Sequence, residues 1–360
     1  MTEKRTNLCS RLIFAAVVWL CVLGLAGCEL SKGPLNNPEA VTAAVEEAGI
    51  KVHFLDVGQG DSELVEADGH FMLIDAGERD QGEKVISYLK GQGVRKLDYV
   101  IGTHPHSDHI GGLEAVIREF DIGTVILPEK EHTTGTYERL LEAIEEKNLK
   151  VRAARAGDSY ELGAAAFQIL SPARSYGDEL NNWSVGIRLT YGDNAFILCG
   201  DAEKEAEADM CQSGLELKAD VLKVSHHGSR TSSSEEFLDR VAPKTAVISC
   251  GRDNDYGHPH EETLEKLKER GIWVLRTDLL GTIVAQGDGK NLQFVYAEAE
   301  EALPSSEART DYVVNENTRK FHLPDCRSVT AMKKENRREY HKTRQELIQM
   351  GYEPCGSCQP

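Results

Sequence analysis

Residues 104–109 read His104-Pro105-His106-Ser107-Asp108-His109, and a β-rich run at 97–103 leads directly into them. The histidines at 104 and 106 can point to one side of an extended backbone, while the aspartate and the third histidine turn toward a second position. Imidazole and carboxylate groups are ligands of zinc and manganese. A solvated, histidine-rich loop is the alternative, but the whole chain has only 12 histidines. The stretch therefore predicts a site for two divalent ions, Zn or Mn.

Two further segments place metal ligands directly after strands. Asp201 follows the apolar run 194–199, and His226 and His227 follow the run 219–224. Strand ends of a layered fold meet at one edge, so we expect these side chains to join residues 104–109. Asp201 could instead be the N-cap of a helix. The expected ligands are His104 and His106 for one ion, Asp108, His109 and either His226 or His227 for the other, and Asp201 for both.

Three more residues are candidates around this site. Asp75 ends the run 70–74 and can orient a ligand histidine through a hydrogen bond, although an aspartate before glycine is also typical of a turn. Asp61 is a second candidate for this supporting role. His258 is a candidate for leaving-group protonation or for an open ligand position, and otherwise an ordinary loop histidine. The residues expected to carry catalysis are Asp108, His227 and His258.

The rest of the body alternates short β-rich runs with helical patterns. Helices are predicted at 82–92, 135–148, 202–212, 234–240 and 261–270. Strands are predicted at 51–57, 70–74, 97–103, 122–127, 164–170, 185–191, 194–199, 219–224, 244–249, 272–276, 281–286 and 292–296. Two such halves pack as face-to-face sheets with helices outside, which predicts an α/β, four-layer αββα sandwich over 50–297.

Three separated segments carry a family resemblance. They read Phe54-Leu55-Asp56-Val57-Gly58-Gln59-Gly60-Asp61-Ser62, Leu222-Lys223-Val224-Ser225-His226-His227-Gly228-Ser229 and Asn254-Asp255-Tyr256-Gly257-His258-Pro259-His260. With residues 104–109, they resemble the hydrolase domain of ComEC-type DNA-uptake competence proteins, within the metallo-β-lactamase superfamily. The resemblance implies the metallo-β-lactamase fold and a nuclease or phosphodiesterase that uses a two-metal-activated hydroxide.

The sequence departs from this family in two respects. Competence proteins carry a multi-helix membrane channel, whereas no apolar run of membrane length lies within the body, so we expect no transmembrane channel. Many members of the superfamily also have another metal histidine before the shared aspartate, but between 110 and 200 only His132 occurs. We expect Asn181 or Asn182 to serve the site instead.

The N-terminal segment is typical of a secretory leader. Basic residues precede an apolar run at 12–25 that is short for a membrane span. The sequence Leu25-Ala26-Gly27-Cys28 resembles the lipobox of bacterial lipoproteins; an uncleaved anchor or a buried helix is the alternative. We expect a signal peptide at 1–27, a lipid on Cys28, a tether at 28–49, and export to the outer face of a bacterial membrane through this lipid alone.

A linker is predicted at 298–310 and a separate module at 311–360. Two close pairs of ligands, His322 with Cys326 and Cys355 with Cys358, indicate a structural zinc. A Cys355–Cys358 disulfide and free thiols are the alternatives. The module resembles the zinc-binding module of the Ada DNA-repair protein, with His322 where that module has a cysteine. A basic run, Lys333, Lys334, Arg337 and Arg338, is either a DNA-phosphate contact or a solvated helix surface.

Charge and cysteine content limit the function. A formal net charge of −18 is unusual for a protein that binds polyanions, so DNA must meet metal ions or a local basic patch. Cys199, Cys211 and Cys250 cannot all pair, so we expect buried thiols and no disulfide framework. The leading hypothesis is a nuclease or phosphodiesterase linked to DNA uptake or degradation. The alternatives are a hydrolase of a small phosphodiester, lactone or thioester, and a non-catalytic DNA-binding lipoprotein.

Overall fold

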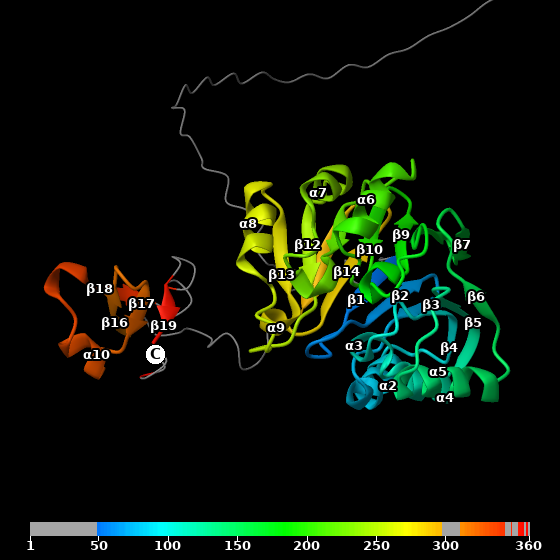
Figure 1. Cartoon of the computed structure of the whole chain (residues 1–360), viewed down its shortest axis with the longest axis horizontal. Coiled ribbons are helices and arrows are strands. Elements are labelled where there is room, and N and C mark those ends of the chain that lie inside the picture. Colours follow the sequence, from blue (N-terminus) through cyan, green and yellow to red (C-terminus); the bar gives the residue numbers. More distant parts are fainter. Residues whose placement is uncertain (1–48, 297–309, 343–346, 348–351, 356–357, 359–360) are drawn as a thin grey trace, which may run out of the picture. The chain divides into compact units, whose positions relative to one another are not determined.

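The structure, a computed structural model, describes residues 49–296, 310–342, 347, 352–355 and 358 (Figure 1). We call residues 49–296 the body and the described residues from 310 onward the tail, and each is described by itself. The predicted signal peptide, Cys28, the tether up to residue 48 and the linker up to residue 309 lie outside the described residues. Among the described residues, no helix combines the length and the apolar character that a membrane span requires.

The first sheet of the body has eight strands in the order β15-β14-β1-β2-β3-β4-β5-β6. Antiparallel pairing joins β1, β2 and β3, and parallel pairing joins β3 to β6. The bounds are β1 Ile50–Phe54, β2 Glu63–Ala67, β3 His70–Ile74, β4 Lys96–Ile101, β5 Asp121–Leu127, β6 Val151–Ala153, β14 Ile283–Gly287 and β15 Leu292–Tyr296. The parallel strands are connected by helices α2 Gly82–Gly91, α3 Ser107–Ile110, α4 Leu113–Glu119 and α5 Gly135–Glu146.

The second sheet has seven strands in the order β13-β12-β11-β10-β9-β8-β7. Its strands are β7 Ser159–Leu162, β8 Ala165–Ser171, β9 Gly186–Tyr191, β10 Asn194–Leu198, β11 Val221–Lys223, β12 Thr245–Ile248 and β13 Trp273–Arg276. Strands β10 to β13 run parallel, so their carboxyl ends lie at the same edge. The helices of this half are α6 Lys204–Gln212, α7 Glu235–Val241, α8 Glu261–Glu269 and α9 Thr277–Leu280.

Three buried clusters lie between successive layers of the body. The central one joins the two sheets and includes Phe54, Phe167 and Phe196. One outer cluster packs α2, α4 and α5 against the first sheet, and the other packs α6, α7 and α8 against the second (Figure 1). Each fully buried phenylalanine contributes about 1.5–3 kcal/mol through removal of apolar area from water. The predicted αββα sandwich is therefore confirmed.

Three strands of the body were absent from the prediction. Strand β2 contains Glu63 and Glu66, and these charged residues interrupt the alternation of apolar and polar residues that predicts a strand. Glu63 is nevertheless buried. Strands β6 and β7 have three and four residues and lie at sheet edges, where polar and charged side chains are tolerated. The three cysteines of the body are buried thiols, and within the described part of the chain they form no disulfide.

The tail forms a four-stranded sheet in the order β18-β16-β17-β19. Its strands are β16 Thr310–Asn315, β17 Lys320–His322, β18 Arg337–Lys342 and β19 Glu353–Pro354, with a short helix α10 Arg327–Thr330. One small core includes Tyr312 and Phe321, and a second joins Val313 to two of the cysteines. Lys334 lies in a short 3-10 helix, Lys334–Asn336, and Arg337 and Arg338 lie in β18, so the basic run does not form the surface of a single helix.

Candidate metal centre

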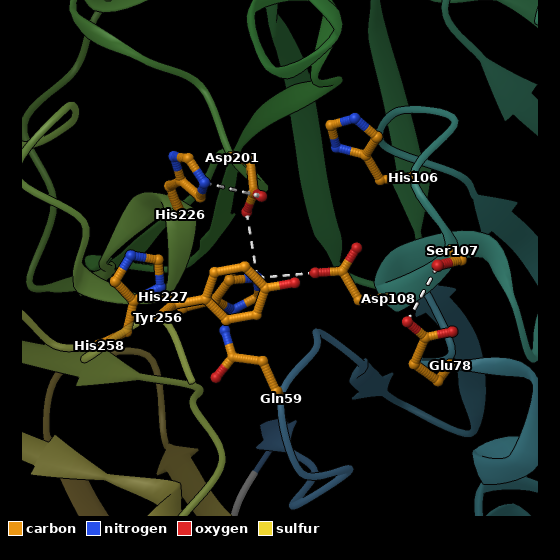
Figure 2. Close-up of a pocket in the computed structure, with 10 residues that line it drawn as sticks. All are labelled: Gln59, Glu78, His106, Ser107, Asp108, Asp201, His226, His227, Tyr256 and His258. Atoms are coloured by element: carbon orange, nitrogen blue, oxygen red, sulfur yellow. Dashed lines mark hydrogen bonds and ion pairs between the residues drawn. The ribbon is translucent and has the colours of Figure 1, made fainter. Parts of the chain in front are cut away.

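Loops that follow β4, β10 and β11 bring the predicted ligands together at one edge of the sandwich. Residues 104–109 follow β4, Asp201 follows β10, and residues 226–227 follow β11. Figure 2 shows Asp108, Asp201 and His227 linked around one space, with His106 at its far side. The parallel strands explain this convergence, since their carboxyl ends share an edge.

One group, which we call the four-residue cluster, consists of Asp108, His109, Asp201 and His227. One ligand atom from each lies within 4.8 Å of all the others. His109 Nε2 is 3.2 Å from Asp201 Oδ2, and His227 Nε2 is 3.3 Å from Asp108 Oδ2. Two imidazoles and two carboxylates at this separation can enclose one divalent cation.

A second group, the three-residue cluster, consists of His104, His106 and Asp201. His104 Nε2 lies 2.9 Å from His106 Nδ1 and 3.8 Å from Asp201 Oδ2. Asp201 therefore belongs to both groups, and its Oδ2 atom faces imidazoles of each. The structure thus places this carboxylate where a residue shared by two ions is required.

Buried atoms without partners test whether these residues fit metal ions. His109 Nε2 and Asp201 Oδ1 are buried and have no hydrogen-bond partner within the described structure. A buried polar atom left in this way costs about 1–3 kcal/mol, so such atoms normally have a ligand. Both belong to the four-residue cluster, whose donor set suits zinc or manganese. The residues present therefore fit divalent cations.

The structure separates the two candidate histidines at 226 and 227. His227 is buried and belongs to the four-residue cluster. His226 points its Nδ1 atom toward Glu203, 3.2 Å away, and its Nε2 atom is 3.9 Å from Asp201 Oδ2. Both residues have a φ of 53°, a left-handed conformation that is costly for histidine. The geometry favours His227 as the ligand, with His226 at the rim.

Asp201 does not cap helix α6. Asn182 fills this role, because its Oδ1 accepts hydrogen bonds from the backbone N–H groups of Glu203 (3.1 Å) and Ala206 (3.3 Å). The neighbouring Asn181 has a buried Oδ1 with no hydrogen-bond partner in the described structure. Neither asparagine is in the cavity lining, so the expectation that one of them replaces the absent histidine stays a prediction. His132 contacts Thr134 and is in neither cluster of the described residues.

Outer contacts hold the two imidazoles of the four-residue cluster. His109 Nδ1 lies 2.8 Å from Asp75 Oδ2, and Thr103 donates to the same carboxylate through its backbone N–H and its hydroxyl. His227 Nδ1 lies 3.0 Å from the carbonyl oxygen of Ser249. With Nδ1 engaged as a donor, each Nε2 is directed at the cluster, where it can bind a metal ion once it has lost its proton. The sequence did not indicate the supporting roles of Thr103 and Ser249, because neither residue type is itself a metal ligand here.

A buried ion pair lies behind the cluster. Lys223 Nζ is 2.6 Å from Asp61 Oδ2, and both side chains are 1% exposed. Asp61 Oδ1 is 3.3 Å from His227 Nδ1, so the predicted supporting role has a geometric basis. Burial opposes the charge on Lys223, but the Asp61 carboxylate outweighs it and raises the lysine pKa. Burial and the nearby Asp61 charge raise the pKa of Glu63, which favours its protonated form.

Charges within the clusters are strongly coupled. Burial alone would lower the pKa of His227, but the Asp201 and Asp61 carboxylates outweigh it and raise the pKa to about 10. Burial would raise the pKa of Asp108, but His109 and the hydrogen bond to His227 lower it to about 2. In the metal-free protein, His227 therefore carries a proton that a cation must displace.

A cavity of about 290 Å³ opens onto these clusters (Figure 2). Its lining consists of Gln59, Glu78, His106, Ser107, Asp108, Asp201, His226, His227, Tyr256 and His258. None of these lining residues is lysine or arginine, so the lining itself gives an anionic substrate no permanent positive charge. Burial and the neighbouring His227 lower the pKa of His258 to about 4, so its imidazole is neutral at pH 7. Gln59, Glu78 and Tyr256 were not predicted to line the site.

The tail brings its four predicted zinc ligands together. The nitrogen or sulfur atoms of His322, Cys326, Cys355 and Cys358 all lie within 4.8 Å of one another. The Nδ1 atom of His322 is buried and has no hydrogen-bond partner in the described structure. Three thiols and one imidazole are a donor set for tetrahedral zinc, so this group also fits its metal.

Comparison with known proteins places these features in one family. The model of the metallo-beta-lactamase superfamily matches residues 55–252. ComE operon protein 3 of Bacillus subtilis is 37% identical over 251 residues, which cover 65% of this chain and 32% of that protein. Competence protein ComA of Neisseria gonorrhoeae is 32% identical over 249 residues, or 69% of this chain and 33% of that protein.

Among solved structures, the metallo-beta-lactamase fold protein YhfI of Bacillus subtilis is 14% identical with a TM-score of 0.45, covering 66% of this chain and 100% of that chain. Residues 55–252, which match the superfamily model, include every residue of both clusters. The chain spans about a third of the length of the two competence relatives.

Proposed function

This chain belongs to the metallo-β-lactamase superfamily of hydrolases, and we propose that it is an exported, lipid-anchored nuclease or phosphodiesterase. The observation that carries the proposal is Asp201, whose carboxylate is shared by two ligand clusters and lines the cavity. The likeness to competence proteins favours DNA as the substrate and a link to DNA uptake or degradation.

The proposed mechanism assigns a task to each group of residues. Divalent ions bound by the two clusters would lower the pKa of water and offset the charge that develops on a phosphate. Asp75 and the Ser249 carbonyl keep the imidazoles of His109 and His227 aimed at the cluster. Neutral His258 lines the cavity and can accept a proton or donate a hydrogen bond to the leaving oxygen.

The experiment is cleavage of fluorescent single-stranded and double-stranded DNA by protein stripped of metal and reloaded with manganese or zinc. The matched variant is Asp108→Ala, which removes one carboxylate from the four-residue cluster and leaves the three-residue cluster intact. We expect metal-dependent cleavage by the wild type and its loss in the variant. Full activity of Asp108→Ala would refute the assignment.

A second candidate function is hydrolysis of a small phosphodiester, lactone or thioester. The net charge of −18 and the absence of lysine and arginine from the cavity lining favour a small substrate over a long polyanion. A metal-loaded protein that leaves DNA intact but hydrolyses small esters would support this candidate. A metal-loaded protein that binds DNA and hydrolyses neither class would instead support a non-catalytic DNA-binding lipoprotein.

The tail is proposed to hold one structural zinc and to contact DNA. Arg337 and Arg338 are exposed on β18, and their charge contrasts with the acidic composition of the whole chain. Replacing Lys333, Lys334, Arg337 and Arg338 with alanine tests this role. We expect weaker DNA binding and a smaller salt dependence, because a protein that makes fewer phosphate contacts releases fewer counterions when it binds.

Lipid attachment at Cys28 is proposed from the lipobox-like sequence Leu25-Ala26-Gly27-Cys28. Expression of the full chain in a bacterium with Cys28→Ala as the matched variant tests it. The wild type should partition into the detergent phase and incorporate labelled palmitate, and the variant should do neither.

A further inference from the structure

Tyr256 is an aromatic residue at the metal cavity that the proposed chemistry leaves unused. It lines the cavity and is 68% exposed, the highest value for a large hydrophobic side chain among the described residues. The other nine lining residues are polar or charged, so no apolar neighbour in the lining covers the ring (Figure 2). An exposed aromatic ring that lines a polar cavity offers a flat apolar face to a ligand in that cavity.

The loop that carries Tyr256 is firmly held. The side-chain amide of Asn254 donates to the carbonyl oxygens of Gly251 (2.9 Å) and His258 (2.6 Å), and its Oδ1 accepts from the His258 N–H (3.0 Å). Gly257 has a φ of +71°, which lets the chain turn directly after the tyrosine. These hydrogen bonds hold the loop in a conformation that leaves Tyr256 exposed.

Three rings form a nearly parallel series from the cavity mouth to the four-residue cluster. The Tyr256 and His258 rings have centroids 5.6 Å apart and an interplanar angle of 21°. The His258 and His227 rings have centroids 6.2 Å apart and an angle of 29°. His227 belongs to the four-residue cluster, so Tyr256 is connected to that cluster through one intervening ring, that of His258.

We propose that Tyr256 is a stacking platform for a nucleobase beside the scissile phosphodiester. The inference rests on the proposed phosphodiesterase function and narrows its substrate to a strand with unpaired bases. Stacking needs no cationic side chain, so it suits a cavity without lysine or arginine in its lining. It also tolerates any sequence, because every base has a flat face, whereas a paired base in a duplex has its faces covered.

The experiment uses single-stranded oligonucleotides in which the scissile linkage is flanked either by normal bases or by abasic tetrahydrofuran residues. We compare manganese-loaded wild type with Tyr256→Ala and Tyr256→Phe, and with Trp273→Ala as a control. Trp273 is 50% exposed and lines another cavity, so this control removes an exposed aromatic ring away from the site. Metal content measured for every variant separates loss of stacking from loss of metal.

We expect the wild type to prefer the base-bearing site by roughly ten-fold in kcat/KM, mostly through KM. Tyr256→Ala should lose this preference and cleave the abasic site at the wild-type rate, while Tyr256→Phe and Trp273→Ala should behave as wild type. Equal losses in Tyr256→Phe and Tyr256→Ala would assign the effect to the hydroxyl and overturn the inference.

Two further outcomes separate this inference from the proposed function. Equal cleavage of both sites by the wild type would overturn the stacking role while the phosphodiesterase proposal stands. No cleavage of either site by metal-loaded wild type would remove the proposed function, and the inference with it.

Discussion

Breaking the buried ion pair between Lys223 and Asp61 is expected to destabilise the body strongly. The two charged atoms are 2.6 Å apart and both side chains are 1% exposed, so Lys223→Met leaves a carboxylate uncompensated in the interior. Loss of one partner of such a pair costs about 3–5 kcal/mol. For a body of this size, each kcal/mol lowers Tm by about 2–4 °C, so the expected fall in Tm is roughly 6–20 °C.

The assay is unfolding by guanidinium, which gives the free energy, and by heat, which gives Tm, both followed by tryptophan fluorescence. Beyond residue 28 the only tryptophans are Trp183 and Trp273, both in the body, so the signal reports the body alone. Lys244→Met is the matched control, because Lys244 pairs with Asp220 at 2.9 Å but is 84% exposed. This surface pair should contribute about 0–1 kcal/mol.

The double variant Lys223→Met with Asp61→Asn separates charge from packing. Removing both charges should restore a large part of the stability that Lys223→Met alone loses, because no uncompensated carboxylate remains. The reasoning is refuted if Lys223→Met costs no more than Lys244→Met, or if the double variant is as unstable as the sum of its single changes.

Three further predictions concern the metals. Asp75→Ala removes the acceptor of the His109 Nδ1 proton, 2.8 Å away, and should weaken metal binding by about 10–100-fold; metal stoichiometry after dialysis against a weak chelator checks this. Folding raises the pKa of His227 from 6.5 to about 10, so its protonated imidazole stabilises the metal-free fold. This stabilisation is complete below pH 6.5 and is lost as pH rises through about 10. Tm of the metal-free protein should therefore fall across this window while metal affinity rises, and an unchanged affinity between pH 7 and 9 would contradict the proton competition. Cys326→Ser should lower the zinc content by one ion and expose the tail to protease, with cleavage of the intact chain near residue 310 as the readout.

The sequence predicted those parts of the site that metal chemistry makes distinctive. His104, His106, Asp108 and His109 stand at fixed offsets after a strand, and the structure brings them to two adjoining clusters. The choice between His226 and His227 required coordinates, because adjacent residues share every sequence signal. The backbone is left-handed at both positions, and the coordinates place the His227 imidazole in the cluster and the His226 imidazole at the rim.

In other parts of the site, the sequence pattern indicates exposed charges where the structure has buried ones. Lys223 lies within the apolar strand β11, where a lysine is usually at an exposed position, and its partner Asp61 is 162 positions away. Strand β2 could not be predicted for the same reason, because its charged Glu63 is buried beside that ion pair. Such long-range pairing of charges leaves no local periodicity, so a reading of patterns along the chain cannot recover it.

The charges around the cavity connect metal binding to substrate binding. Asp61, Asp75, Asp108 and Asp201 supply four carboxylates, and Lys223 supplies a buried ammonium group that pairs with Asp61. With His227 protonated, these groups and Glu78 of the cavity lining carry three net negative charges before metal binds, and two divalent ions, which displace that proton, would bring the sum to zero. An anionic phosphodiester would therefore be repelled from the metal-free cavity, and bound ions would remove this repulsion. Because no lysine or arginine in the cavity lining can replace the ions, the proposed function predicts that metal is needed for substrate capture as well as for the chemical step. For this reason a purely DNA-binding role at the cavity would still require both metals.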